Sequence, residues 1–309
     1  MSDLVDTSPW KAYSLGDIYK HGKPEAMLKR DEMLYLYWLA REYYKGKGDI
    51  IDLGPLTGGS TVCFAGGLAD NKNVPDSEKY PVQSYDLFVY DGLWGDLSKR
   101  GIFPGDDFFN LFAETIAPCS HMVNAHKGDI FEVTEYDRDI EFLFVDLAKS
   151  PALFQHVAKV FFPKVILSDG LVIHQDYRFS GMPYLKAFQE TFHDCFELIP
   201  FARDVPTVAF RLIKELPDDF DQQVDALSNL SGSELITLID RARDRFEGTD
   251  WLIMESSSIS QLVLNGSFDE AEERFRKAVV NKSMNDAARN WVKIAISQHP
   301  QAGSLTKLL

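Results

Sequence analysis

Residues 49–70 read DIIDLGPLTGGSTVCFAGGLAD, and this stretch decides the fold. The β-branched run at 50–53 predicts a short buried strand that stops at Gly54. A second pair of glycines at 58–59 closes the turn, and the apolar residues after Thr61 predict a helix. A strand, a glycine-rich turn and a helix in this order form the basic unit of an α/β sheet.

The same alternation continues along the chain to about residue 214. Further strands are predicted at 82–88, 121–126, 142–145, 171–174, 196–201 and 207–213, and helices at 24–45, 107–117, 150–161 and 182–194. Strands that alternate with helices indicate a mostly parallel sheet with helices on both faces. We therefore expect an α/β fold with a doubly wound, seven-stranded sheet. Only the short segment ARDVP separates the last two strands, which we expect to pair antiparallel.

The pattern becomes wholly helical after residue 215. Ser231 with Glu234, and Ser267 with Glu270, have the spacing of capping boxes that open helices. We expect three regions, which are an N-terminal helical cap at 1–47, a sheet domain at 48–214 and a C-terminal helical extension at 215–309. The extension is interpreted as a cap or as the element through which the chain forms a homodimer.

Composition restricts the classes of partner. The net charge of −15 repels phosphate backbones and anionic lipids, so neither nucleic acid nor a membrane surface is an expected partner. The three cysteines, Cys63, Cys119 and Cys195, are widely spaced and form no CxxC pair, which argues against disulfides and thiolate metal sites. The N-terminus lacks the pattern of a signal peptide, and no apolar run is long enough to span a membrane, so we expect a cytoplasmic location.

The glycine-rich turn carries the main chemical signal. Glycines let the backbone approach a ligand closely, and the N-terminus of the following helix offers N–H groups to an anion. The turn lacks both the G-x-G-x-x-G pattern of dinucleotide sites and the P-loop pattern of nucleotide sites. The string DLGPLTGGST resembles motif I of class I S-adenosylmethionine-dependent methyltransferases, especially the small-molecule O-methyltransferases. The resemblance extends over about residues 25–214 and implies a Rossmann-like methyltransferase fold. It also implies that this turn binds the amino-acid part of the cofactor through Asp52, Gly54, Gly58, Gly59, Ser60 and Thr61.

The resemblance assigns two more acids to the cofactor. Asp86 ends the second strand, where a carboxylate accepts hydrogen bonds from both ribose hydroxyls, and Asp91 is the alternative. Asp129 follows the third strand, where the family contacts the adenine.

Two further strand ends resemble the metal-dependent catechol- and caffeoyl-type O-methyltransferases. Asp146 and Lys149 follow the fourth strand, and Gln175 and Asp176 follow the fifth. The resemblance implies that Asp146, Gln175 and Asp176 hold Mg²⁺ and that Lys149 takes the proton of a substrate hydroxyl. The family has an acid where this chain has Gln175, and the loss of one negative charge leaves a metal-free site as an equal alternative.

His174 offers a metal-free alternative for proton removal. A histidine beside this edge of the sheet is able to act as general base at neutral pH, unless strand periodicity turns its ring into the core. The leading interpretation is methyl transfer to a hydroxyl of a small molecule, such as a sugar or a secondary metabolite. Two alternatives stay open, a catalytically silent cofactor-binding regulatory partner and a sugar-nucleotide transferase. The segment 88–106 is interpreted as a mobile lid over the substrate.

Overall fold

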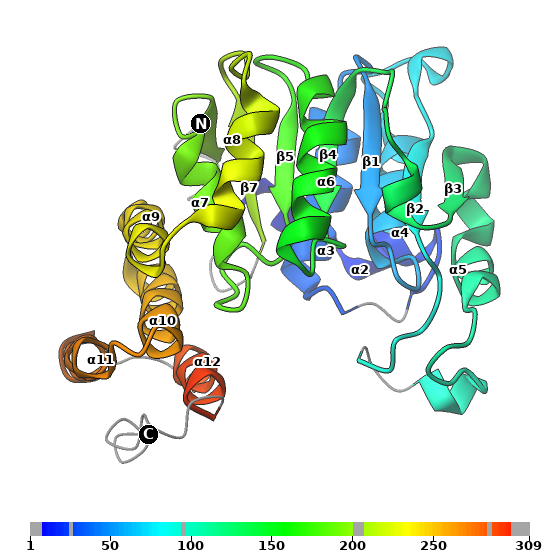
Figure 1. Ribbon diagram of the computed structural model, residues 1–309. Helices are drawn as coiled ribbons and strands as arrows, with labels where there is room; N and C mark the ends of the chain where they lie inside the picture. The colour runs from blue at the N-terminus through cyan, green and yellow to red at the C-terminus, as the bar shows by residue number, and fades with distance from the viewer. Residues whose placement is uncertain (1–7, 25–26, 94–96, 200–206, 283–285, 298–309) are drawn as a thin grey trace. The chain divides into compact units, whose positions relative to one another are not determined.

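The computed structural model describes residues 8–24, 27–93, 97–199, 207–282 and 286–297 (Figure 1). Seven strands form one sheet in the order β3-β2-β1-β4-β5-β7-β6. The strands are β1 Asp49–Leu53, β2 Val82–Asp86, β3 Val123–Lys127, β4 Ile140–Val145, β5 Leu171–His174, β6 Phe196–Ile199 and β7 Val208–Leu212. The pairs β1–β2, β1–β4, β2–β3 and β4–β5 are parallel. The predicted seven-stranded, mostly parallel sheet is confirmed, and with its flanking helices it has a Rossmann-like α/β architecture.

Side chains alternate between two buried faces of this sheet. Ile50 and Phe144 belong to the core cluster that contains α3 (Arg30–Trp38) and α4 (Gly59–Asp70). On the opposite face, Tyr85 contacts Phe161 of α6 (Pro151–Phe161) with ring centroids 5.8 Å apart. Figure 1 shows α6 in front of the sheet, with α3 and α4 behind it. Burial on both faces explains why β4 is apolar except for Glu141, whereas β1 buries two acids, Asp49 and Asp52, among its apolar residues.

The N-terminal region is helical, as expected, but its main helix is shorter than the predicted 24–45. It comprises η1 (Pro9–Ala12), α2 (Leu15–Tyr19), α3 and the π-helical turn η2 (Leu39–Tyr43). The helix α3 begins at Arg30 because the Glu32 carboxylate accepts a hydrogen bond from the Lys29 backbone N–H at 2.9 Å and caps the helix there.

The helices α5 (Phe109–Ile116) and α7 (Pro183–Thr191) lie close to the predicted 107–117 and 182–194. The structure adds short helical turns that were not predicted, which are η3 (Asp76–Glu78), η4 (Leu97–Arg100), η5 (Ala117–Met122), η6 (Ile130–Glu132) and η7 (Phe162–Lys164). The strand order places β7 beside β6, as expected for the last two strands. The predicted connection ARDVP lies outside the described residues. Cys63, Cys119 and Cys195 are free and buried, in agreement with the prediction of no disulfides.

The chain divides into two compact units. One division falls between Glu215 and Leu216, the boundary given above, and the second unit also includes Asp176–Phe196, which was expected in the sheet domain. The first unit holds residues up to Gln175 and most of β6 and β7, whereas the second holds Asp176–Phe196 and Leu216–Leu309. The helix α7 therefore groups with the C-terminal helices, because it packs against α9.

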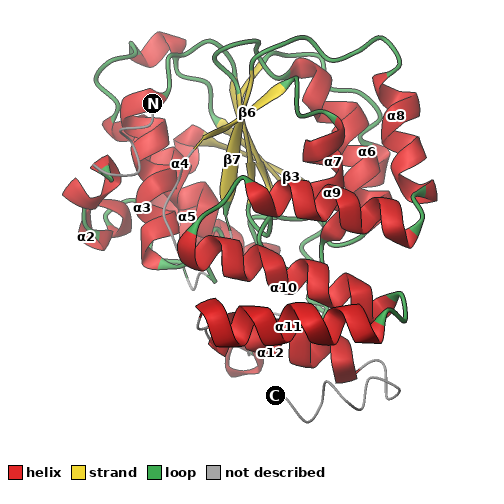
Figure 2. Ribbon diagram, turned by 90° about the vertical axis from the view of Figure 1, so that its left-hand side faces the viewer, coloured by secondary structure: helices red, strands yellow, loops and turns green. Residues whose placement is uncertain are grey.

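The second unit contains α7, α8 (Phe220–Ala226), η8 (Leu227–Asn229), α9 (Gly232–Asp244), α10 (Gly248–Leu264), α11 (Phe268–Lys282) and α12 (Asp286–Ser297). The helix α10 packs against α9, α11 and α12 (Figure 2). The predicted capping box is present at the start of α9, where Ser231 and Glu234 exchange hydrogen bonds of 2.8 and 3.3 Å. Among the described residues, no helix combines the length and apolar character that crossing a membrane requires.

Candidate functional site

The carboxyl edge of the sheet brings the predicted site residues of the first unit together. The chain leaves β1 toward β2 and β3 on one side and returns to β4 and β5 on the other, so the strand order reverses between β1 and β4. In open α/β sheets this reversal opens the crevice in which ligands bind. Backbone hydrogen bonds continue the sheet past the strand ends, from Gly54 N–H to Tyr85 O at 2.9 Å and from Asp146 N–H to Leu53 O at 2.9 Å.

Asp52 lies on the α4 face of β1 and is completely buried. Ser60 Oγ lies 2.8 and 2.9 Å from its two carboxylate oxygens, and Thr61 Oγ1 donates at 2.5 Å to Oδ2. Burial raises the pKa of Asp52 to about 7, although the Thr61 and Ser60 hydroxyls act in the opposite direction. The sequence analysis assigned Asp52, Ser60 and Thr61 to the cofactor. In the structure the Ser60 and Thr61 hydroxyls both hydrogen-bond to the Asp52 carboxylate, so these side chains hold the turn to the strand end.

Gly54 and Gly58 both have backbone conformations that favour glycine, with φ of 87° and 95°. A Cβ at Gly54 would lie 2.8 Å from the backbone N of Leu147, which follows β4. The turn therefore approaches the β4 loop as closely as backbone atoms allow. Gly59 is the first residue of α4, and the first helical hydrogen bond runs from Val62 N–H to Gly58 O at 2.9 Å.

Asp86 connects the turn to the end of β2. Its Oδ2 accepts a hydrogen bond from Leu56 N–H at 3.2 Å, and its Oδ1 accepts one from Phe88 N–H at 2.8 Å. Leu56 and Phe88 have φ of 51° and 55°, a left-handed conformation that costs a residue with a side chain about 1–2 kcal/mol. Burial raises the pKa of Asp86 to about 6, and the nearby Asp146 charge adds to this effect. The second predicted cofactor acid therefore lies directly beside the glycine-rich turn.

The left-handed conformations of Leu56 and Phe88 were not predicted from the sequence. Neither residue type signals a left-handed turn, because leucine and phenylalanine rarely adopt one. The signal that was available is Pro55, which precedes Leu56 and marks a turn.

The two remaining acids that were considered for the cofactor, Asp129 and Asp91, are exposed and lie in loops. Asp129 Oδ1 accepts a hydrogen bond from Phe131 N–H at 3.0 Å and caps η6. Asp91, the alternative for the ribose, accepts one from Leu93 N–H at 2.8 Å. The backbone of Gly128 donates to Asp86 O at 3.1 Å, so the segment that carries Asp129 begins next to Asp86. The direct hydrogen bond from the turn favours Asp86 over Asp91 as the ribose ligand.

Lys149 and Asp146 form an ion pair after β4. The Lys149 ammonium lies 2.6 Å from Asp146 Oδ1, and both side chains are partly exposed, by 31% and 25%. This pair is accessible to a ligand. It follows β4, one of the two strands between which the strand order reverses. The two residues that the sequence analysis proposed for chemistry at β4 are therefore in contact with each other.

The His174 ring lies in the core rather than at the edge. It is completely buried on the α6 face, with ring centroids 5.9 Å from Phe154, 6.1 Å from Phe162 and 5.9 Å from Phe210. A general base has to reach the proton that it removes. This packing is the alternative that strand periodicity allowed, and we assign His174 no step in the reaction proposed below.

Gln175 follows β5, and its backbone N–H donates to Val145 O at 3.1 Å, beside Asp146. The side chain is only 8% exposed, and its Oε1 accepts no hydrogen bond from the described residues. A buried amide oxygen without a donor is costly, so this atom is a candidate for ligand contact.

Asp176 is the first residue of the second unit. Its negative charge favours the protonated form of the buried Lys186 side chain in α7. Lys186 is completely buried, and its Nζ donates to Phe179 O at 2.7 Å and to Met182 O at 3.4 Å. Burial lowers the pKa of Lys186 to about 7, whereas Asp176 raises it. Sequence analysis missed Lys186, because a lysine within a helix is usually exposed.

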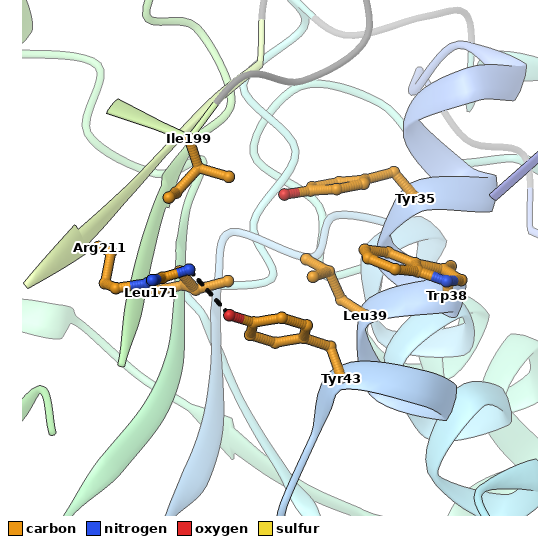
Figure 3. Close-up of a pocket in the computed structure, with 7 residues that line it drawn as sticks. All are labelled: Tyr35, Trp38, Leu39, Tyr43, Leu171, Ile199 and Arg211. Atoms are coloured by element: carbon orange, nitrogen blue, oxygen red, sulfur yellow. Dashed lines mark hydrogen bonds between the residues drawn. The ribbon is translucent and has the colours of Figure 1, made fainter. Parts of the chain in front are cut away.

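A small pocket of the first unit lies away from this edge (Figure 3). Its empty space is about 200 Å³, and it has room for about one water molecule. Leu171, the first residue of β5, lines it, which places it at the amino end of that strand, opposite to Gln175. Arg211 donates a hydrogen bond to the Tyr43 hydroxyl at 2.9 Å beside it. The remaining lining residues are Tyr35, Trp38, Leu39 and Ile199.

Comparison with known proteins gives little further information. Neither a protein-family model nor a curated protein matches this sequence. A protein from Pyrococcus horikoshii, described as a proposed RNA methyltransferase, is 16% identical, with a TM-score of 0.37 over 66% of this chain and 96% of that protein. A protein from Thermoplasma acidophilum is 12% identical, with a TM-score of 0.36 over 64% of this chain and 93% of that one. Likenesses this weak support no conclusion about function, which has to come from the site itself.

Proposed function

We propose that this chain binds S-adenosylmethionine at the Gly54–Ser60 turn and Asp86, and that it transfers the methyl group to a hydroxyl of a small molecule. One observation carries the proposal, the hydrogen bond from Leu56 N–H to Asp86 Oδ2. It joins the turn that would bind the amino-acid part of the cofactor to the carboxylate that would bind the ribose. Both lie where the strand order reverses, which is the usual ligand position in such a sheet.

The residues at this edge fit the cofactor. Each Asp86 oxygen accepts one protein hydrogen bond, and a carboxylate has about four acceptor positions in all, so two positions are left for a ribose diol. The N–H groups of Gly59, Ser60 and Thr61 precede the first helical hydrogen bond of α4 and have no partner within the helix. Such N–H groups bind carboxylates, and the ligand's amino acid carries one.

The chemistry requires little from the protein. When bound, S-adenosylmethionine supplies a methyl carbon whose bond to sulfur breaks, with the electron pair going to sulfur, as the hydroxyl oxygen bonds to that carbon. The chain has to orient the hydroxyl and accept its proton. Asp146 is the proton acceptor in this proposal, and the Lys149 ammonium at 2.6 Å orients the carboxylate.

The charge of the chain favours a small acceptor over a nucleic acid. The net charge of −15 opposes the approach of a polyanion, and Asp86 and Asp146 add negative charge at the edge of the sheet. A small molecule that carries hydroxyl groups meets no such repulsion.

Isothermal titration calorimetry of the full chain with S-adenosylmethionine tests the proposal. We expect saturable binding that Asp86→Asn weakens at least about tenfold, since one charge-assisted hydrogen bond contributes about 1.5–3 kcal/mol. The matched control is Asp91→Asn, which should leave the affinity unchanged because the Asp91 carboxylate accepts a hydrogen bond from Leu93 N–H in its own loop, whereas Asp86 accepts one from the turn.

Asp86 also accepts hydrogen bonds from Leu56 and Phe88, so Asp86→Asn can weaken binding by disturbing the fold. A second measurement therefore varies the ligand and uses only the wild-type protein. Wild-type protein is titrated with adenosine and with 2′,3′-dideoxyadenosine, and the dideoxy compound should bind more weakly. Equal binding of the two nucleosides would overturn the assignment of Asp86. Binding of a sugar nucleotide without S-adenosylmethionine would support the transferase alternative. Tight cofactor binding with no methyl transfer to any of a panel of hydroxyl compounds would favour the silent regulatory partner.

A further inference from the structure

The side chains after β4 and β5 do not fit a divalent metal ion. Magnesium prefers hard oxygen ligands, and its affinity rises with the number of charged carboxylates. The predicted ligands are two carboxylates and one neutral amide, Asp146, Asp176 and Gln175. Within the described ranges, no group of three or more His, Cys, Asp or Glu side chains is arranged to hold a metal.

One of the two carboxylates, Asp146, already faces a lysine. The Lys149 ammonium lies 2.6 Å from Asp146 Oδ1, and a dication bound to this carboxylate would be repelled by that ammonium. The resident Lys149 cation therefore neutralises the negative charge of Asp146 that a metal would need.

Gln175 carries the second, independent observation. Its side chain is more than nine-tenths buried, and Oε1 accepts no hydrogen bond from the part of the chain that the structure describes. An amide oxygen is a good acceptor for a hydroxyl proton, but it provides no charge to hold a dication. Its backbone bond to Val145 O places it beside the strand end that carries Asp146.

We propose that methyl transfer in this protein is independent of a divalent metal, with Gln175 Oε1 accepting a hydrogen bond from a hydroxyl of the acceptor molecule beside the Asp146–Lys149 ion pair. This inference rests on the proposed function and defines its acceptor as a neutral molecule that carries hydroxyl groups. Carboxylate or phosphate acceptors are disfavoured, because an amide oxygen and a carboxylate both repel an anion. In this arrangement Gln175 is a specificity residue, and Lys149 takes the place of the metal as the local positive charge.

Manganese binding to the full chain, followed by electron paramagnetic resonance, tests this inference without an activity assay. Wild-type protein should show only weak binding to its acidic surface, which Asp146→Asn and the control Asp91→Asn leave equally unchanged. The double variant Gln175→Asp/Lys149→Met adds a carboxylate and removes the resident cation. It should bind Mn²⁺ at least about tenfold more tightly, and a further Asp146→Asn change should abolish the gain.

Two outcomes overturn the inference. One is tight, stoichiometric Mn²⁺ binding by the wild type that Asp146→Asn removes. The other is a folded double variant that gains no affinity, because Gln175 and Lys149 would then not be what excludes the ion. Titration of the same samples with S-adenosylmethionine distinguishes a failure of this inference from a failure of the proposed function. Failure of the proposed function appears as absent cofactor binding in the wild type, whatever manganese does.

Discussion

Ser60 Oγ lies 2.8 and 2.9 Å from the two oxygens of the Asp52 carboxylate, so the first turn of α4 is tied directly to the end of β1. Asp52 has no exposed surface, and its pKa of about 7 lies well above the usual value because burial disfavours the charged form. Asp52 therefore supports the turn and also titrates near neutral pH.

Asp52 should make the stability of the fold depend on pH. Its pKa is raised in the folded state, so the folded chain binds more protons than the unfolded chain between about pH 4 and pH 7. Stability from this group is fully present below about pH 4 and is lost as the pH rises through about 7, by up to about 4 kcal/mol. Asp52→Asn should remove this dependence. Urea denaturation of both proteins from pH 4.5 to 8 measures it, and parallel curves would contradict the pKa.

Cofactor binding should release protons from Asp52. The ammonium of a bound S-adenosylmethionine stabilises a nearby carboxylate, which lowers the pKa of Asp52 from about 7. Calorimetric titration at pH 6.5 in two buffers with different ionisation enthalpies should therefore give different apparent enthalpies. Asp52→Asn should bring the two values together. If the wild type already gives the same enthalpy in both buffers, the charge of the ligand does not act on Asp52.

Gly54→Ala should lower the stability of the fold far more than Gly105→Ala, a matched change at another glycine with positive φ. The new Cβ would lie 2.8 Å from Leu147 N and 3.1 Å from the carbonyl carbon of Asp146, and φ is 87°. We expect a loss of more than about 3 kcal/mol, because backbone on both sides has to move. Gly105→Ala, at φ of 94° with no atom within 4 Å, should lose only about 1–2 kcal/mol from the left-handed conformation alone. Equal losses in denaturant unfolding would show that the turn and the β4 loop are not in close contact.

His174 should matter for packing and not for cofactor binding. Its ring fills an apolar layer among Phe154, Phe162 and Phe210, so His174→Ala should cost about 2–4 kcal/mol through the cavity that it leaves. His193→Ala, whose side chain is half exposed, should change stability by less than about 0.5 kcal/mol. Affinity for S-adenosylmethionine should stay unchanged in both variants. A His174→Ala protein of normal stability would disagree with this placement of the ring.

The second unit contains a network of ion pairs that includes Arg274, whereas the neighbouring Arg276 lies outside it. Replacing these two arginines should have different effects on stability. Arg274 in α11 donates to Glu255 at 2.8 and 3.0 Å and to Asp240 at 2.6 and 3.1 Å, and Glu255 is buried. Arg274→Ala should therefore destabilise the chain by about 2–4 kcal/mol, because it leaves buried negative charge with a single arginine, Arg243. Arg276→Ala removes only an exposed pair with Glu272 and should cost less than about 0.5 kcal/mol. Unfolding by urea compares the two, and similar losses would mean that the network adds no stability.

Local patterns determined a large part of the fold. The run at 50–53 and the apolar run at 142–145 predict buried strands because two-sided burial demands continuous apolar sequence, and both form central strands of the sheet. The boundary at 215 depended on a change in local pattern, and the second unit also contains Asp176–Phe196, which precedes that boundary in the sequence. The helix α7 has the sequence of a sheet-flanking helix, but it packs against α9, and such a choice of neighbour leaves little trace in local sequence.

The candidate site shows the same division. By itself the sequence determined which residues stand at or beside strand ends, because the predicted strands end next to Asp52, Asp86, Asp146 and Gln175. Tertiary structure alone decided where their side chains point and what they contact. It buried Asp52 under the Ser60 and Thr61 hydroxyls, turned His174 into the core, and paired Asp146 with Lys149. The physical reason is that hydrophobic periodicity is a property of neighbouring residues, whereas hydrogen bonds, ion pairs and burial depend on groups that only folding brings together.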